Sequence, residues 1–112
     1  MRNYRVCLRM TQDEIKKMDI VSFCYETDRS GLLRIWIWQE TRILGIDVTH
    51  LSSKIVVRKK RRTGTIEVNI RLTALERLLI KTITRAKKLK GLSMGFINWV
   101  ESEYHKHAEA NR

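Results

Sequence analysis

The sequence predicts an α+β fold built from two copies of one strand-helix-helix unit. The main observation is a motif that occurs twice, 62 residues apart: residues 5–14 read RVCLRMTQDE, and residues 67–76 read EVNIRLTALE. Each copy is a strict alternation of polar and apolar residues that runs directly into a helix-start signal. Because an internal repeat determines the architecture of a chain, we expect both halves to fold in the same way and to share one core.

The alternating runs predict two short strands, each with an apolar side and a polar side, since successive side chains of a strand point to opposite faces. The apolar sides, which we expect to face the core, are Val6, Leu8 and Met10 in the first copy and Val68, Ile70 and Leu72 in the second. The polar sides, which we expect to face outward, are Arg5, Cys7, Arg9, Glu67, Asn69 and Arg71.

A helix is expected directly after each strand, because each strand ends in a capping box. The two boxes are Thr11 with Glu14, and Thr73 with Glu76. The apolar stripes that follow at helical spacing are Ile15, Met18, Val21 or Ser22, and Tyr25 in the first helix, and Leu75, Leu78, Leu79, Ile83, Ala86 and Leu89 in the second. We expect these helices to end near Arg29 and near Gly91, and Cys24 to be a small buried apolar residue beside the first stripe.

A second helix is expected in each copy, starting from a serine that can cap it: Ser30 in the first copy and Ser93 in the second. If the inter-helix loops of the two copies differ by one residue, the apolar residues of these helices correspond in pairs. The pairs are Leu33 with Phe96, and Ile37 with Val100.

The segment between the copies predicts an additional strand. Residues 46–53 read as a connector, residues 55–57 are β-branched, residues 58–62 are all basic, and Thr63-Gly64 is a turn signal. This pattern is typical of a hairpin, so the extra strand should pair with the strand of the second copy. Alternatively, the basic run is an arm that folds only on a nucleic acid. The organisation expected is therefore a first unit at 1–45, a connector at 46–64 and a second unit at 65–112.

The charge distribution predicts a polyanionic partner. The net charge is +11, but residues 1–53 carry 8 Lys and Arg against 7 Asp and Glu, whereas residues 54–112 carry 15 against 5. A half with a net charge of +10 favours nucleic acid. No apolar segment reaches the length of a membrane span and no signal peptide is recognisable, so we expect no membrane contact and a location in the cytoplasm of the host cell.

The chain offers little for catalysis or metal binding. It has two cysteines, Cys7 and Cys24, and the pair His105 and His107 has no cysteine or carboxylate cluster near it in the sequence. No nucleophile-base pair, phosphate loop or carboxylate dyad is present. We therefore expect no enzyme activity, no metal and no cofactor.

The order of elements, with Arg9 and Arg71 at matching places in the two strands, resembles the ribbon-helix-helix family of DNA-binding repressors over nearly the whole chain. In that family two protomers each contribute one strand to an antiparallel ribbon that enters the major groove. Here both copies lie on one chain, so the resemblance implies a monomeric pseudo-dimer: a duplicated ribbon-helix-helix with four helices and a central ribbon. The tandem version of the fold occurs in some conjugative-plasmid DNA-processing proteins and in AvtR-like regulators of archaeal filamentous viruses, which are the closer comparison.

The resemblance also implies roles for individual residues. The outward set, Arg5, Cys7, Arg9, Glu67, Asn69 and Arg71, would contact bases, with Arg9 and Arg71 at the family's base-reading positions. Because the two strands differ in chemistry, the DNA site need not be palindromic. Backbone groups at Ser30, Gly31, Ser93 and Met94 would hold phosphates, together with the basic run Arg58, Lys59, Lys60, Arg61 and Arg62.

The function expected is a sequence-specific double-stranded DNA-binding regulator of transcription, a repressor in the first place and an activator as a further role. Two alternatives use the same fold: a plasmid-transfer DNA-processing accessory or DNA-bending protein, and an antitoxin-type interaction protein. Apolar residues on the helix Leu32 to Trp38 exceed what one core can take, so we expect the monomer to self-associate on DNA through this surface.

Overall fold

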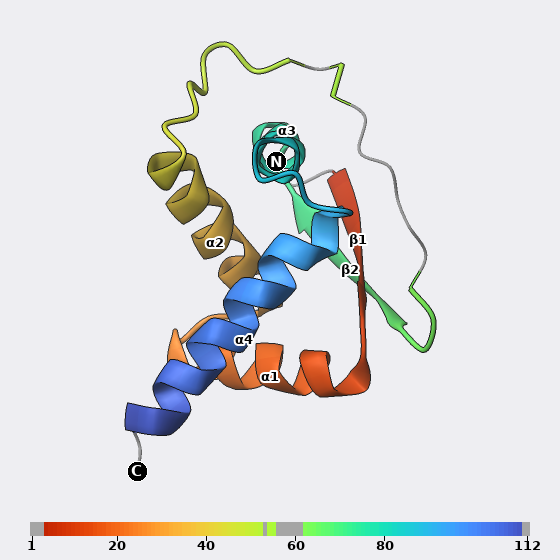
Figure 1. The fold of residues 1–112 in the computed structure, drawn as a ribbon, viewed down its shortest axis with the longest axis vertical. Coiled ribbons are helices and arrows are strands. Elements are labelled where there is room, and N and C mark those ends of the chain that lie inside the picture. The colour runs from red at the N-terminus through yellow and green to blue at the C-terminus, as the bar shows by residue number, and fades with distance from the viewer. Residues whose placement is uncertain (1–3, 53, 56–61, 111–112) are drawn as a thin grey trace.

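A computed structural model of the chain describes residues 4–52, 54–55 and 62–110. These residues form an α+β fold with four helices and one two-stranded sheet (Figure 1). The order strand, helix, helix occurs twice, as the repeat predicts. The elements are β1 (Tyr4–Met10), α1 (Gln12–Cys24), α2 (Arg29–Ile43), β2 (Ile66–Leu72), α3 (Ala74–Ala86) and α4 (Leu92–Ala110).

The two strands pair in antiparallel fashion around the centre of the repeat. Cys7 lies opposite Asn69, and these two residues hold the same place in the two copies of the motif. On either side of this central pair, Arg5 lies opposite Arg71 and Arg9 lies opposite Glu67. The pairing of the two strands is therefore centred on equivalent positions of the repeat.

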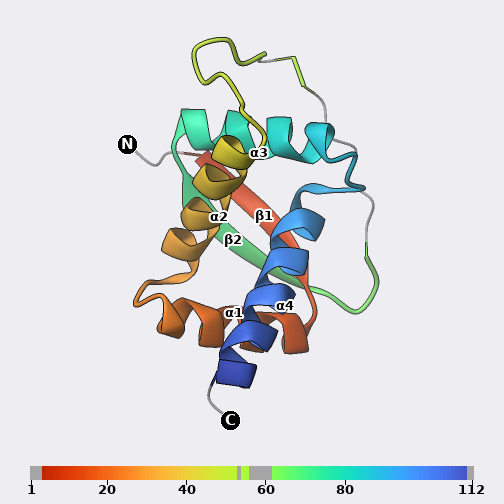
Figure 2. The ribbon, with the colours of Figure 1, turned by 60° about the vertical axis from the view of Figure 1, so that its left-hand side comes forward.

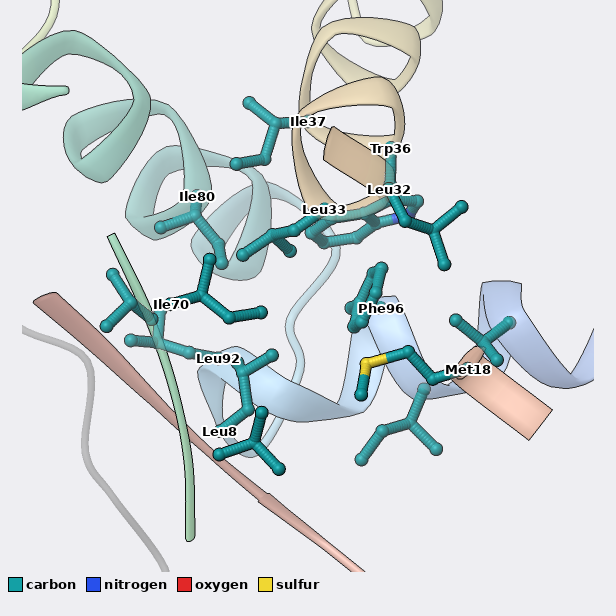
Figure 3. Close-up of a cluster of buried hydrophobic side chains, with 14 of the residues drawn as sticks. Leu8, Met18, Leu32, Leu33, Trp36, Ile37, Ile70, Ile80, Leu92 and Phe96 are labelled. Atoms are coloured by element: carbon teal, nitrogen blue, oxygen red, sulfur yellow. The ribbon is translucent and has the colours of Figure 1, made fainter. Parts of the chain in front are cut away.

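The core lies against one face of the strand pair, as the alternation predicts. Figure 2 shows α2 and α4 crossing in front of this face, with α1 and α3 at opposite ends of the molecule. The close-up in Figure 3 shows side chains from all six elements meeting there, among them Leu8, Ile70 and Phe96. All six residues predicted for the inner face are at most 5 % exposed: Val6, Leu8, Met10, Val68, Ile70 and Leu72.

Both predicted capping boxes are present. The backbone N–H of Glu14 donates to the Thr11 hydroxyl at 3.2 Å, and the Glu14 carboxylate accepts from the Thr11 N–H at 2.8 Å. At the second box, Thr73 and Glu76 make the same two bonds at 3.1 and 3.0 Å. The strand-to-helix corners of the two halves are thus built by the same local chemistry.

The predicted ends of the first helices are wrong: α1 ends at Cys24 and α3 at Ala86, five residues before Arg29 and Gly91. Each helix stops because a residue just beyond it is left-handed, Glu26 with φ 54° and Lys88 with φ 53°. The following N–H groups bond back over the last turn, from Thr27 to Ser22 and from Leu89 to Thr84, each at 3.0 Å. This is a Schellman motif, in which the left-handed residue is usually glycine. Because neither helix has a glycine at that position, the sequence does not show where either helix ends.

Several residues of the predicted helix stripes lie at the surface instead. Cys24, predicted to be buried, is exposed, and so is Ala86, because each is the last residue of its helix and lies beyond the packed turns. Tyr25 and Leu75 are each 37 % exposed. In α3 the buried apolar positions are Leu79, Ile80 and Ile83, so the core stripe is rotated towards Ile80, which the sequence reading omitted.

The predicted serine N-cap of the second helix is also wrong. Asp28 caps α2, and its carboxylate accepts from the Gly31 N–H at 2.7 Å. Ser30 and Ser93 are instead the second residues of α2 and α4. The predicted pairing of the second helices is confirmed, because the loop before α4 is one residue longer than the loop before α2. The paired residues Leu33 and Phe96, and Ile37 and Val100, are all buried.

The surface predicted for self-association includes only part of the helix Leu32 to Trp38, and self-association itself stays a prediction. Leu32 is fully buried, and Ile35 is half-buried. Trp38 is 39 % exposed, and its indole N–H donates to the Glu76 carboxylate at 3.3 Å. Because Leu32 is fully buried in the core, it does not belong to a self-association surface.

The connector is described in part. Gly64 has φ 67° and sits in the predicted turn just before β2. Ile46 and Leu51 pack against the core, and Ile55 is 8 % exposed. The predicted third strand falls mainly on residues 56–61, which lie outside the described residues, so this strand stays a prediction.

Candidate nucleic-acid interface

The polar face of the strand pair points away from the core. Of the six residues predicted to face outward, Arg5, Glu67, Asn69 and Arg71 are exposed, and Cys7 and Arg9 are half-buried. All six lie on alternate positions of paired strands, so their side chains share one face. This outer face is where the family resemblance implies base contacts.

The outer face has two chemically different ends. At one end Arg5 and Arg71 lie directly opposite each other, and two like charges at that spacing repel. At the other end Arg9 lies opposite Glu67, and the Cys7 thiol donates to the Glu67 carboxylate at 2.9 Å. The carboxylate thus offsets cationic charge at one end only.

The second helices begin beside the strands and are held there by serines. The Ser30 hydroxyl, at the start of α2, donates to the backbone oxygen of Arg71 in β2 at 3.3 Å. The Ser93 hydroxyl, at the start of α4, accepts from the backbone N–H of Arg9 in β1 at 3.1 Å. Each half therefore holds the strand of the other half, and each helix start lies beside one of the two arginines predicted to read bases.

A hollow of about 850 Å³ opens where α4 starts. The described residues that line it include three cations and one carboxylate. Its lining is Cys7, Arg9, Arg62, Thr63, Glu67, Lys90, Gly91, Leu92, Ser93 and Met94. The Met94 N–H, one of the groups that the family resemblance assigns to phosphate, makes a long bond of 3.4 Å to the Gly91 oxygen.

A second hollow, of about 750 Å³, opens where α2 starts and holds as many carboxylates as cations. Its lining is Asp19, Ser22, Phe23, Thr27, Asp28, Arg29, Ser30, Asn69, Ile70 and Arg71. The Arg29 guanidinium donates to both Asp19 oxygens at 2.7 and 2.9 Å, which holds the pKa of Asp19 below its ordinary 3.8 although burial opposes the shift. The Gly31 N–H, predicted for phosphate, is already bonded to Asp28.

Arg62 is the one residue of the predicted basic run that the structure describes, and it binds the protein itself. Its guanidinium donates to the two Glu14 oxygens at 2.9 and 3.2 Å and to the Arg9 backbone oxygen at 3.2 Å. Burial raises the pKa of Glu14, but the bonds from Arg62 and Thr11 outweigh it, so the pKa falls below its ordinary 4.5. Arg62 thereby holds the connector at the β1–α1 corner; Arg58, Lys59, Lys60 and Arg61 lie outside the described residues.

The sequence reading missed several residues that shape this region. Asp28 is as good an N-cap as Ser30, so residue type alone could have favoured it. The bonds from Arg29 to Asp19 and from Arg62 to Glu14 join residues 10 and 48 positions apart, and no local pattern announces them.

Within the described part of the chain, no three His, Cys, Asp or Glu side chains come together as a metal site would require. No helix there is long and apolar enough to cross a membrane. Comparison with protein-family models, with curated proteins and with solved structures gives no match for this chain.

Proposed function

We propose that the protein is a sequence-specific double-stranded DNA-binding regulator of transcription, which inserts its strand pair into the major groove in the manner of a duplicated ribbon-helix-helix. One observation carries the proposal: the outer face of a two-stranded antiparallel ribbon is polar, accessible and rich in arginine, in a chain with a net charge of +11.

The dimensions of the ribbon suit this use. Each strand has seven residues, so the ribbon is about 20–24 Å long at the usual rise of a strand. A two-stranded ribbon is narrow enough to enter the major groove, which is about 12 Å wide, whereas the minor groove is about half as wide. The core packs on the opposite face, so the outer face can meet the bases without unfolding.

The side chains on the outer face match the edges of base pairs in the major groove. Arginine is the natural bidentate partner of guanine, so Arg5, Arg9 and Arg71 supply guanine contacts. Asn69, at the centre, can bridge adenine in the same way. Glu67, held by Cys7, can accept from a cytosine amino group.

The charge of the second half supplies the general attraction to the phosphate backbone. Binding through Lys and Arg releases counterions, and it brings the protein to any duplex before bases are read. A protein bound in this way at a promoter excludes RNA polymerase, which makes repression the simplest regulatory outcome.

In vitro selection from a random duplex pool tests the proposal, followed by competition against scrambled DNA. We expect an enriched sequence, and we expect Arg71→Ala to lose about 1–3 kcal/mol of discrimination at one base pair. The matched control is Arg42→Ala, which removes the same charge from the far end of α2. If no sequence is enriched, or if Arg71→Ala and Arg42→Ala retain the same selectivity, the proposal is wrong.

A further inference from the structure

The two copies of the repeat differ in charge at equivalent positions. Aligning the two copies of the sequence by the 62-residue repeat pairs Asp19 of α1 with Lys81 of α3, and Phe23 with Arg85. At the starts of the second helices, the repeat is shifted by one residue and places Asp28 on Gly91. Each of these changes makes the first half less cationic than the second.

The extra residue in the longer loop adds to the difference. The loop before α4 has five residues and the loop before α2 has four. Lys90 falls in the longer loop, is exposed, and lines the hollow beside Arg9. Its neighbour Gly91, directly before α4, brings no carboxylate, whereas Asp28 brings one to the same place before α2.

These differences bear on the two sides of the outer face. We call the hollow beside Arg9 and Ser93 the α4 flank, and the hollow beside Arg71 and Ser30 the α2 flank. On the α4 flank, Arg62 is bound to Glu14, which leaves Arg9 and Lys90 against the Glu67 carboxylate. On the α2 flank, Arg29 is bound to Asp19, which leaves Asp28 to oppose Arg71.

We infer that the protein holds the DNA backbone on the α4 flank alone, and that the α2 flank holds no phosphate because Asp28 opposes Arg71 and Asp19 binds Arg29, so that each molecule binds its site in one direction. This inference rests on the proposed function. The Asp28 carboxylate and a phosphate on the α2 flank would repel each other, and salt screens such repulsion only partly at separations below one Debye length, which is about 10 Å at 0.1 M salt. The arginine pair Arg5 and Arg71 then meets bases on the side where backbone contact is absent.

Ethylation interference on the selected duplex tests this inference, since it reports each phosphate whose modification prevents binding. For the wild-type protein we expect interference on one side of the contacted major groove. Lys90→Gln should weaken binding about threefold or more and reduce that interference. Its control, Lys106→Gln, removes the same charge near the far end of α4 and should change neither.

Asp28→Asn is the decisive variant, because asparagine caps a helix as well as aspartate and the change removes only the charge. We expect affinity to rise about threefold or more, new interference to appear on the opposite side of the groove, and the slope of log affinity against log salt to steepen by about 0.9 for each phosphate gained. Asp19→Asn, which releases Arg29, should act in the same direction. Glu109→Gln, at the end of α4, is the control for charge alone.

The outcomes separate this inference from the proposed function. If no duplex is enriched, the proposed function itself is wrong. Suppose that a duplex is enriched but interference is equal on both sides of the groove, or that Asp28→Asn behaves as Glu109→Gln does. Then the inference of backbone contact on the α4 flank alone is wrong, while the proposal of sequence-specific binding is unaffected.

Discussion

Replacing the left-handed residues that end α1 and α3 with glycine should stabilise the protein. Glu26 and Lys88 have φ of 54° and 53°, and the repeat places them at equivalent positions. Each turn sets the direction from which the second helix of its half approaches the ribbon. The variants Glu26→Gly and Lys88→Gly keep the Schellman bonds, which involve only backbone groups.

The size of the effect follows from two opposing terms. A residue with a Cβ pays about 1–2 kcal/mol in the left-handed region, a cost that glycine avoids. Glycine in turn adds about 0.5–1 kcal/mol of conformational entropy to the unfolded chain. The net gain expected is about 0.5–1 kcal/mol at each site. For a chain of 112 residues, 1 kcal/mol corresponds to a shift in Tm of about 4 °C.

Thermal unfolding followed by circular dichroism measures these shifts. We expect each single variant to raise Tm by about 2–4 °C and the double variant by about the sum. Gly45→Ala is the reverse test, because it adds a Cβ to a left-handed residue. Gly45 has φ 63°, and the added Cβ would meet no atom within 4 Å. That variant should lose about 1 kcal/mol from the backbone alone. If both glycine variants lower Tm, the left-handed conformation assigned to Glu26 and Lys88 is wrong.

Two further variants test packing and ion pairing. Gly95→Ala should lower the free energy of unfolding in urea by about 1–3 kcal/mol, because the new Cβ would lie 2.7 Å from Leu89 and from the buried ring of Trp36. The control Gly91→Ala, where an added Cβ meets open space, should lower it far less. Equal effects of the two variants would contradict the packing of α4 on α2. The lowered pKa of Glu14 means that the folded state binds fewer protons than the unfolded state, so this pair stabilises the protein above about pH 4.5 and the contribution is lost as the pH falls. Glu14→Gln should therefore flatten the loss of stability between about pH 6 and pH 3, and an unchanged profile would show that Arg62 does not bind this carboxylate.

The sequence predicted the strands and their faces because a period of two leaves little choice once one face is buried. The alternation from Val6 to Met10 and from Val68 to Leu72 assigned every inner residue correctly. The capping boxes are equally predictable from the sequence, since the two partners of each box lie within three residues of each other. The internal repeat then related the two halves and predicted the pairing of Leu33 with Phe96.

The helix ends are harder to predict from the sequence, because they depend on a left-handed backbone conformation and not on residue type. Lys88 is not a glycine, and the first glycine after α3 in the sequence is Gly91, so the sequence predicts an end near Gly91. Cys24 was assigned to the core for the same reason: extending the helix extended its apolar stripe.

The outer face of the candidate site could be predicted from the sequence, but its flanks could not. The six outward residues follow from strand parity alone. The pairing of Arg29 with Asp19, and of Arg62 with Glu14, requires helices and connector to be placed in space. The repeat alone aligns Asp28 with Gly91, but only the structure shows that both residues lie beside the ribbon, where a difference in charge can affect DNA binding.

The central claim is that the outer face reads bases from the major groove, and dimethyl sulfate interference on the selected duplex tests it most directly. Methylation of guanine N7 blocks the major groove, whereas methylation of adenine N3 blocks the minor groove. We predict that guanine N7 methylation prevents binding at defined positions, and that Arg71→Ala abolishes the effect at one of them. Interference from adenine N3 alone, with guanine methylation tolerated throughout the site, would contradict the claim.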